Sequence, residues 1–171
     1  MSRIPEQPPV RKDGLQLDEH RRFQERFWTI ERFAWLMFSL IIVLAMLGAF
    51  GAGGPLATKV TETERAVVEH PRIGRWEGTD EMTVKYKPDP AKQTRSLFLP
   101  DAFAKVFQVE DIQPLPIRTA IEAGGQRLHF DNPRQDGGVI KLHLRAQTAG
   151  SATFDIIVDD APASLSSFIF P

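Results

Sequence analysis

The most prominent feature of the hydrophobic pattern is an uninterrupted apolar run from Phe33 to Phe50. It contains no charged residue, and Ser39 carries its only hydroxyl group. A helix over residues 30–51 would rise about 1.5 Å per residue and so cross a hydrocarbon layer of about 30 Å. We therefore predict a transmembrane helix over residues 33–51. The sequence Gly51-Ala-Gly-Gly-Pro55 is expected to end it, because glycine and proline terminate helices.

A buried core helix and a cleaved signal peptide fit the apolar run less well. A core helix would show one polar face, and this run has none. A cleaved signal peptide is suggested by the small residues Ala49 and Gly51. However, a long segment precedes the run, and the run exceeds the ~7–15 residues usual for the apolar region of a signal peptide. The pattern therefore favours an uncleaved signal anchor.

A helical period precedes the run. Apolar residues recur there at helical spacings among charged ones, and they are Leu17, Phe23, Phe27, Ile30 and Phe33. This predicts an amphipathic juxtamembrane helix over residues 15–32, after a proline-containing disordered cytoplasmic tail over residues 1–14. The helix either docks onto a partner subunit or lies in the lipid headgroup layer. In the second case Trp28 and Trp35 would be interfacial anchors.

The pattern changes again after a linker over residues 52–65. Short segments with alternating polarity are separated by Gly, Pro and Asp turns, as is typical of an antiparallel sandwich. We predict an all-β domain over residues 66–171, immunoglobulin-like in outline, with a short helical turn over residues 100–105. The expected strands are Ala66–Glu69, Met82–Tyr86, Arg95–Leu99, Val106–Ile112, Ile117–Ala123, Gln126–Asp131, Val139–Gln147, Ala152–Asp159 and Ser164–Phe170.

The first expected hairpin turns at Gly124-Gly125. A two-residue type I′ turn needs positive φ at both central positions, which glycine supplies. This turn would pair Glu122 with Arg127 and Ile121 with Leu128. Opposite charges would then share one face and apolar residues the other.

The second expected hairpin turns at residues 149–151. A three-residue loop would pair Arg145 with Asp155 and Lys141 with Asp159. A shift of one residue would set apolar against polar side chains along both strands. The alternation therefore predicts that these two strands are neighbours in one sheet.

Charge predicts the orientation of the anchor. Lysine and arginine are concentrated before the apolar run, whereas only Lys59 and Arg65 lie close behind it. The positive-inside rule then places the N-terminus in the cytoplasm and the β domain outside, in the periplasm of a bacterium whose inner membrane holds the helix. The net charge of -1 gives no reason to expect nucleic acid as a partner, and the lack of cysteine excludes disulfides and thiolate catalysis.

The β domain offers little recognisable chemistry. Its histidines, His70, His129 and His143, lack the His-x-x-x-His spacing of many zinc sites. His129 and His143 are expected on polar faces of separate strands, so adjacent pairing would bring them together. Surface histidines account for the pattern more simply. We predict no catalytic residue, no cofactor and no metal site.

The residues expected to contact a partner are Phe23, Phe27, Trp28, Trp35, Gly48 and Trp76. Gly48 lies among small residues that permit the close approach of another helix. Trp76 is flanked by arginines, and both residue types are enriched at binding hot spots. A core tryptophan or an anchor at the membrane surface would account for Trp76 equally well.

Three features together resemble uncharacterised bacterial single-span membrane proteins. They are the charged lead Leu17–Trp28, one apolar span, and Gly53-Gly54-Pro55-Leu56 before a short β domain. Such proteins are often encoded beside YetF-type membrane proteins, so the resemblance implies an integral membrane partner of that type. We therefore predict a non-enzymatic accessory subunit of a bacterial envelope complex. The alternatives are an anchored ligand-binding sensor and, with less support, an anchored hydrolase.

Overall fold

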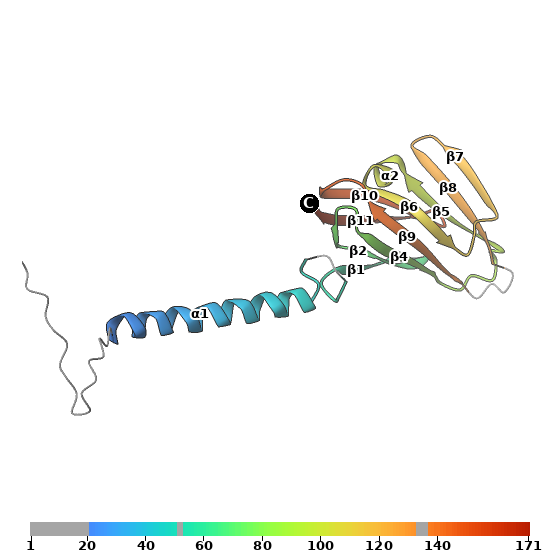
Figure 1. The fold of residues 1–171 in the computed structure, drawn as a ribbon. Helices are drawn as coiled ribbons and strands as arrows, with labels where there is room; N and C mark the ends of the chain where they lie inside the picture. The colour runs from blue at the N-terminus through green and yellow to red at the C-terminus, as the bar shows by residue number, and fades with distance from the viewer. Residues whose placement is uncertain (1–20, 51–52, 133–136) are drawn as a thin grey trace, which may run out of the picture. The chain divides into compact units, whose positions relative to one another are not determined.

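The computed structural model describes residues 21–50, 53–132 and 137–171. The chain divides into two compact units, Met1–Ile42 and Val43–Pro171. Most of helix α1 (Arg21–Met46) belongs to the first unit, and the β domain forms the second (Figure 1). The expected tail over residues 1–14 and the first turns of the expected amphipathic helix lie outside the described residues.

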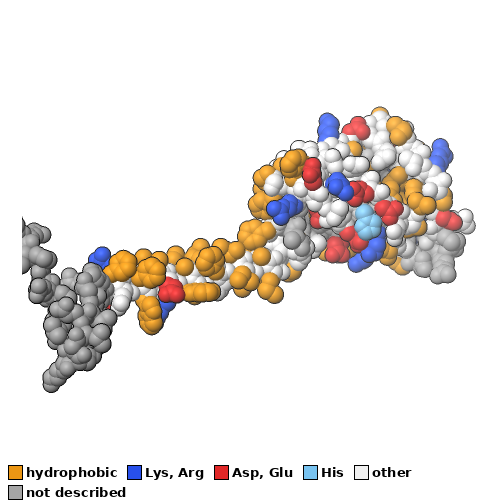
Figure 2. All heavy atoms as spheres, in the orientation of Figure 1, with side chains coloured by type: hydrophobic (Ala, Val, Ile, Leu, Met, Phe, Trp, Pro, Cys, Tyr) orange, Lys and Arg blue, Asp and Glu red, His pale blue; other side chains and the backbone are white. Residues whose placement is uncertain are grey.

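Helix α1 is one continuous helix of 26 residues, with no break between the amphipathic and apolar segments. At about 1.5 Å per residue it is about 39 Å long. Its part Phe23–Met46 is long and apolar enough to span a membrane, and its most apolar window is 0% buried. Figure 2 shows hydrophobic side chains along the whole helix. By length and composition it is a candidate membrane anchor or signal sequence.

The helix ends earlier than the sequence pattern suggested. Gly48 has a φ of +86°, and its N–H donates to the carbonyl of Ala45 at 3.0 Å. The N–H of Ala49 donates to the carbonyl of Leu44 at 3.0 Å. These two bonds form a Schellman motif, in which a left-handed glycine closes the helix. The expected stop at residues 51–55 is therefore wrong, because Gly48 already supplies the left-handed conformation.

Strands make up most of the second unit. They are β1 (Thr58–Glu62), β2 (Ala66–Pro71), β3 (Ile73–Arg75), β4 (Thr79–Tyr86), β5 (Thr94–Pro100), β6 (Phe107–Gln113), β7 (Arg118–Glu122), β8 (Gly125–Asp131), β9 (Val139–Ala146), β10 (Gly150–Val158) and β11 (Ala161–Phe170), with the short helix α2 (Asp101–Val106) between β5 and β6. Every strand expected from the alternation is present. Two were missed: β3 has only three residues, and β1 lies in the segment assigned to the linker.

The strands form two sheets that share one core (Figure 1). One sheet has the order β1-β2-β4-β9-β6 and the other β3-β11-β10-β5-β8-β7. Their pairs are antiparallel except that β3 runs parallel to β11, so a purely antiparallel sandwich is not found. Alternate residues of each strand point inward, such as Met82 and Val84 from one sheet and Leu97 and Leu99 from the other.

Helix α2 closes one end of this core with aromatic side chains. The ring of Phe103 lies 5.5 Å from that of Phe107 and 5.1 Å from that of Phe154, measured between centroids. All three residues are buried. The short helical turn expected over residues 100–105 is thus confirmed, and its one buried side chain connects the two sheets.

The β7–β8 hairpin exists, but its expected register is wrong. Glu122 pairs with Gly125 and Ile121 with Gln126, so the turn residues are Ala123 and Gly124. The difference is two positions, which keeps every side chain on its expected face. The alternation therefore could not separate the two registers. Arg127 still forms an ion pair with Glu122, at 2.8 Å, as a diagonal neighbour.

The second expected hairpin is wrong in kind. Strand β9 lies between β4 and β6 in the five-stranded sheet, whereas β10 lies between β11 and β5 in the other. The chain therefore crosses from one sheet to the other between β9 and β10. Both strands still direct their apolar sides into the core, so the same alternation fits a hairpin and a crossover. Lys141 pairs with Glu81 instead of Asp159, and Arg145 pairs with Glu110.

Candidate functional site

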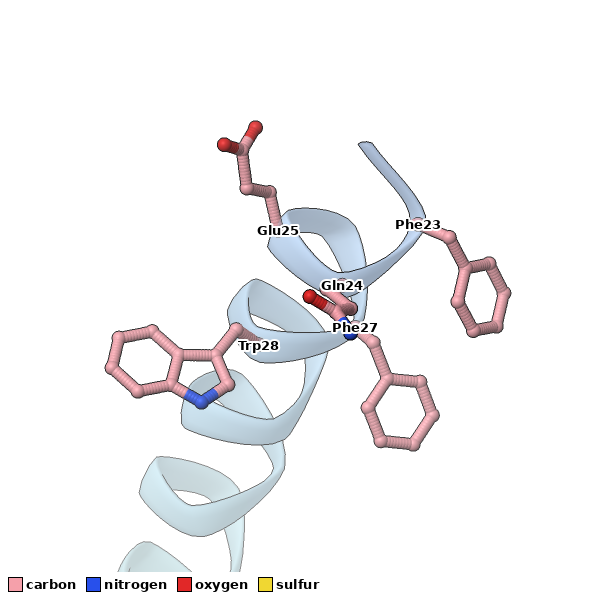
Figure 3. A pocket seen from close by; sticks show the side chains of 5 residues that line it. All are labelled: Phe23, Gln24, Glu25, Phe27 and Trp28. Carbon is pink, nitrogen blue, oxygen red and sulfur yellow. The ribbon is translucent and has the colours of Figure 1, made fainter. Parts of the chain in front are cut away.

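The N-terminal part of α1 holds the first group of expected contact residues. Phe23 and Phe27 lie one turn apart, and their rings stack with centroids 6.1 Å apart. Both are exposed, at 67% and 59%. A groove on the helix surface is lined by these rings together with Gln24, Glu25 and Trp28, all from this one helix (Figure 3). The groove is therefore an open surface that no other described element closes.

The tryptophans of α1 do not belong to the same face as the Phe23–Phe27 pair. Figure 3 shows Trp28 on one side of the helix and the two phenylalanines on the other. Trp35 follows Trp28 by seven residues, so the two tryptophans share a face. Arg32 lies over the Trp28 ring, 4.5 Å from its centroid. The structure thus separates a phenylalanine face from a tryptophan face.

Gly48 is the helix cap described above and does not lie on the surface of the helix. It is buried, and a Cβ there would lie 2.1 Å from the carbonyl oxygen of Gly53. The next turn is tied to the helix end, since the N–H of Leu56 donates to the carbonyl of Leu47 at 3.0 Å. The carbonyl of Ala57 in turn accepts the N–H groups of Arg72, between β2 and β3, and of Ile73, the first residue of β3. Gly48 therefore allows the chain to turn back on itself before β1 and offers no contact surface for another helix.

Trp76 lies at the end of β3 and is 51% exposed, so it is not a core tryptophan. The backbone N–H of Trp76 donates to the backbone carbonyl of Phe170 at 2.7 Å. Nearby on β11, the rings of Phe168 and Phe170 pack edge to face with centroids 4.9 Å apart. The structure thus places Trp76 beside further aromatic residues that the sequence pattern does not single out.

The histidines do not converge. His129 is on β8 and His143 on β9, in different sheets, so the suggested pairing of their strands is wrong. His70 lies inside the domain, only 1% exposed. Burial lowers the pKa of His70 against the opposing effect of the Ser166 and Val68 carbonyls, and neither ring nitrogen makes a hydrogen bond of normal geometry. Among the described residues, no group of three or more His, Asp or Glu side chains could hold a metal ion.

A buried ion pair is the strongest polar feature of the β domain. Arg95 and Asp159 are 2% and 3% exposed, and a guanidinium nitrogen of Arg95 donates to Asp159 Oδ2 at 2.8 Å. The other carboxylate oxygen, Oδ1, accepts the N–H of Ser96 at 2.8 Å. A second guanidinium nitrogen donates to the Lys87 carbonyl at 2.8 Å. The pair thus fixes the β10–β11 turn against β5.

A polar hollow of about 520 Å³ lies over this turn. Basic side chains of Lys92, Arg127 and His129 line it beside the acidic Asp159 and Asp160. Lys92 lies 3.6 Å from Asp160, and Arg127 is already paired with Glu122. The charges of the hollow therefore largely neutralise one another.

A second hollow, of about 510 Å³, lies beside the start of β4. Its lining includes Glu69, Asp80 and Glu81. Burial raises the pKa of Asp80 to about 6, and its Oδ2 atom has no hydrogen-bond partner among the described residues. Glu81 differs because Lys141 donates to it at 3.0 Å and lowers its pKa. The two neighbouring carboxyl groups thus shift in opposite directions.

The sequence contained a signal for two of these buried groups. Arg95 is in phase with Leu97 and Leu99, and His70 is in phase with Ala66 and Val68. A charged or polar residue in phase with buried apolar ones indicates that it is buried too, and a buried charge needs a partner. The partner of Arg95 could not be identified in this way, because Asp159 is distant in sequence.

No family model matches the chain, and no curated protein matches it.

Proposed function

We propose that the chain is a non-enzymatic, membrane-anchored accessory subunit of a bacterial envelope complex. The observation that carries the proposal is α1, whose apolar side chains are exposed along its length. Exposed apolar surface of this extent needs lipid or another protein to cover it. In this proposal α1 is an uncleaved anchor in the inner membrane, with its N-terminus in the cytoplasm and the β domain in the periplasm.

The Phe23–Phe27 pair supports a protein partner for the anchor. The pair is on the N-terminal side of the apolar run, and the charged residues Glu25 and Arg26 lie between its two members in sequence. Aromatic residues at such a boundary contact either lipid headgroups or another protein. We propose the second, with an integral membrane protein as the partner. The resemblance described above implies a YetF-type protein in this role.

The β domain would be the part of the subunit that acts outside the membrane. Its two sheets of short strands share a core, which supports an immunoglobulin-like outline as part of the proposal. Sandwich domains of this kind present strand edges and end loops to partner proteins. The exposed Trp76, whose backbone N–H donates to the Phe170 carbonyl, is a surface residue of the expected type.

An anchored ligand-binding sensor is the second candidate function. The polar hollow at Lys92 and Asp160 favours it, because a polar ligand could interact there with both a basic and an acidic side chain. The balance of charges in that hollow makes this candidate weaker than the accessory subunit. The anchored hydrolase is not proposed, since His129 and His143 lie on different sheets.

Affinity purification in mild detergent tests the proposed partner. Phe23→Ala/Phe27→Ala would remove the aromatic pair, and Leu36→Ala is the control because Leu36 is equally exposed, at 70%, and lies on the opposite side of the helix from Phe27. We expect one membrane protein to co-purify in stoichiometric amount with the wild type and with the control, and to be lost with the double variant. Recovery of all three chains without a partner would contradict the proposal.

A further inference from the structure

Strand β7 is an open edge of the six-stranded sheet. It pairs with β8 along one side, and β8 pairs with β5 beyond it. No described strand pairs with the other side of β7. An edge strand leaves alternate N–H and C=O groups unpaired, and these groups are a template for another strand.

The surroundings of β7 are unusually apolar for an exposed edge. Ile121 on the strand is 84% exposed, and Leu115 and Ile117 just before it are 78% and 62% exposed. Ile121 and Thr119 are on the same side of the sheet as Leu128, which is buried. The five-stranded sheet therefore covers β8 but does not extend over β7. Exposed apolar groups next to unpaired backbone indicate a site of association.

Each of the other sheet edges is short, irregular or carries a lysine, whereas β7 carries the oppositely charged residues Arg118 and Glu122. Strand β3 has only three residues. Strand β6 is interrupted by a register shift between Val109 and Asp111, where Glu110 and Asp111 are adjacent acidic residues. Strand β1 carries Lys59, and lysine on an edge disfavours pairing. Strand β7 has a regular register along its whole length.

The sequence of β7 is complementary to itself. In an antiparallel pair of two β7 strands centred on Ala120, Arg118 of each copy lies opposite Glu122 of the other. Thr119 lies opposite Ile121 in the same arrangement. Charges of opposite sign stabilise an antiparallel pair when their residues lie directly across from each other. The two-fold symmetry doubles each such contact, as in other isologous interfaces.

We propose that β7 is a homodimerisation strand that pairs antiparallel with β7 of a second copy of this chain. The pairing joins the two six-stranded sheets into one continuous sheet across a two-fold axis at Ala120. This interface is independent of the partner proposed for α1, because it uses a distant part of the sequence and a different kind of contact.

Cysteine cross-linking of the full chain in detergent tests the register, since the wild-type chain has no cysteine. Opposed residues of an antiparallel pair have Cα atoms about 4.5–5.5 Å apart, within disulfide reach. Ala120→Cys should therefore give a disulfide-linked dimer on mild oxidation. Thr119→Cys is the matched control, because its two copies would be offset by two residues and more than about 7 Å apart. Equal cross-linking of both variants, or of neither, would overturn the proposal.

Charge reversal provides a second test that does not depend on oxidation. Arg118→Glu and Glu122→Arg should each weaken the homodimer about tenfold, because like charges then oppose each other twice. Mixing the two variants should restore association, since every opposed pair in the mixed dimer has opposite charges. Differently tagged chains measure this by co-purification. Failure of the mixture to associate better than each variant alone would overturn the proposal, as would a different polypeptide in place of the second copy at this edge.

Discussion

Arg95 and Asp159 are 64 residues apart in sequence and form an ion pair at 2.8 Å inside the β domain. Arg95 lies on β5, and Asp159 comes just after β10. The guanidinium also lies over the ring of Tyr86 on β4, 5.5 Å from its centroid. Burial raises the pKa of the Tyr86 hydroxyl, which donates to the carbonyl of Ser96 at 3.0 Å. The two sheets are thus joined at this point by a network around one buried ion pair.

We expect Asp159→Asn to destabilise the protein by about 3–5 kcal/mol, because it leaves the buried Arg95 guanidinium without a counter-charge. Denaturant unfolding in detergent measures the change. Asp160→Asn is the control: Asp160 is exposed, and its loss should change the free energy of unfolding by less than about 0.5 kcal/mol. Equal effects of the two substitutions would show that the buried pair has no special role.

Gly48→Ala should destabilise the turn that follows α1. A Cβ at this position would lie 2.1 Å from the Gly53 carbonyl oxygen, and the φ of +86° disfavours an L side chain. Gly53→Ala is the matched control, since Gly53 has a φ of +84° but a Cβ there would meet nothing within 4 Å. We expect about 1–2 kcal/mol of backbone strain in both variants, with a clear further loss for Gly48→Ala. Equal melting temperatures for the two variants would contradict the role of Gly48 as a crowded helix cap.

Asp80 should oppose folding at neutral pH. Its folded-state pKa, about 6, is above its ordinary value. The contribution of Asp80 to the free energy of unfolding is therefore fully present below pH ~4 and is lost as the pH rises through about 6. Asp80→Asn should therefore raise the free energy of unfolding at pH 7.5 by about 1–2 kcal/mol, after allowance for solvent screening, and leave it nearly unchanged at pH 4. Glu81→Gln is the neighbouring control with the opposite sign, because Lys141 lowers the pKa of Glu81. An Asp80→Asn variant that gains no more stability over wild type at pH 7.5 than at pH 4 would refute this.

His70 should have the reverse pH dependence. Burial lowers its pKa, so its stability contribution is present above the ordinary imidazole pKa of about 6.5 and is lost as the pH falls below it. We expect His70→Leu to reduce the acid-side slope of the free energy of unfolding by up to about 1.4 kcal/mol per pH unit. Unfolding curves between about pH 4 and 7 measure this slope. The same slope in both proteins would show that His70 is not buried in its neutral form.

The sequence predicted the strands and their inward faces well, because alternation directly reports which side of a strand is buried. It did not predict which strands are neighbours. The apolar sides of β9 and β10 would face one core in a hairpin and in a crossover between sheets, so Arg145 and Asp155 were paired wrongly. The helix end was placed too late for a related reason. Several glycines follow the apolar run, and hydropathy alone does not identify Gly48 as the one that closes the helix.

The candidate site was predictable only where exposure follows from pattern. The aromatic residues of α1 are exposed, because the helix carries apolar side chains on more than one face. The separation of Phe27 and Trp28 onto different faces follows from helical geometry and was open to prediction. In contrast, the network of Arg95 depends on contacts between distant segments. Such contacts leave no local trace beyond a charge at an inward position.

The location of the intact chain relative to the membrane decides whether α1 is an anchor. Ala149→Cys, on an exposed loop of the β domain, and Gln24→Cys, on α1, are two single-cysteine probes in a chain without native cysteine. In spheroplasts we expect a membrane-impermeant maleimide to label Ala149→Cys and not Gln24→Cys, with the full 19.3 kDa chain retained in carbonate-washed membranes. A shorter, released chain, or labelling of Ala149→Cys only after lysis, would contradict a membrane-anchored protein with its β domain outside.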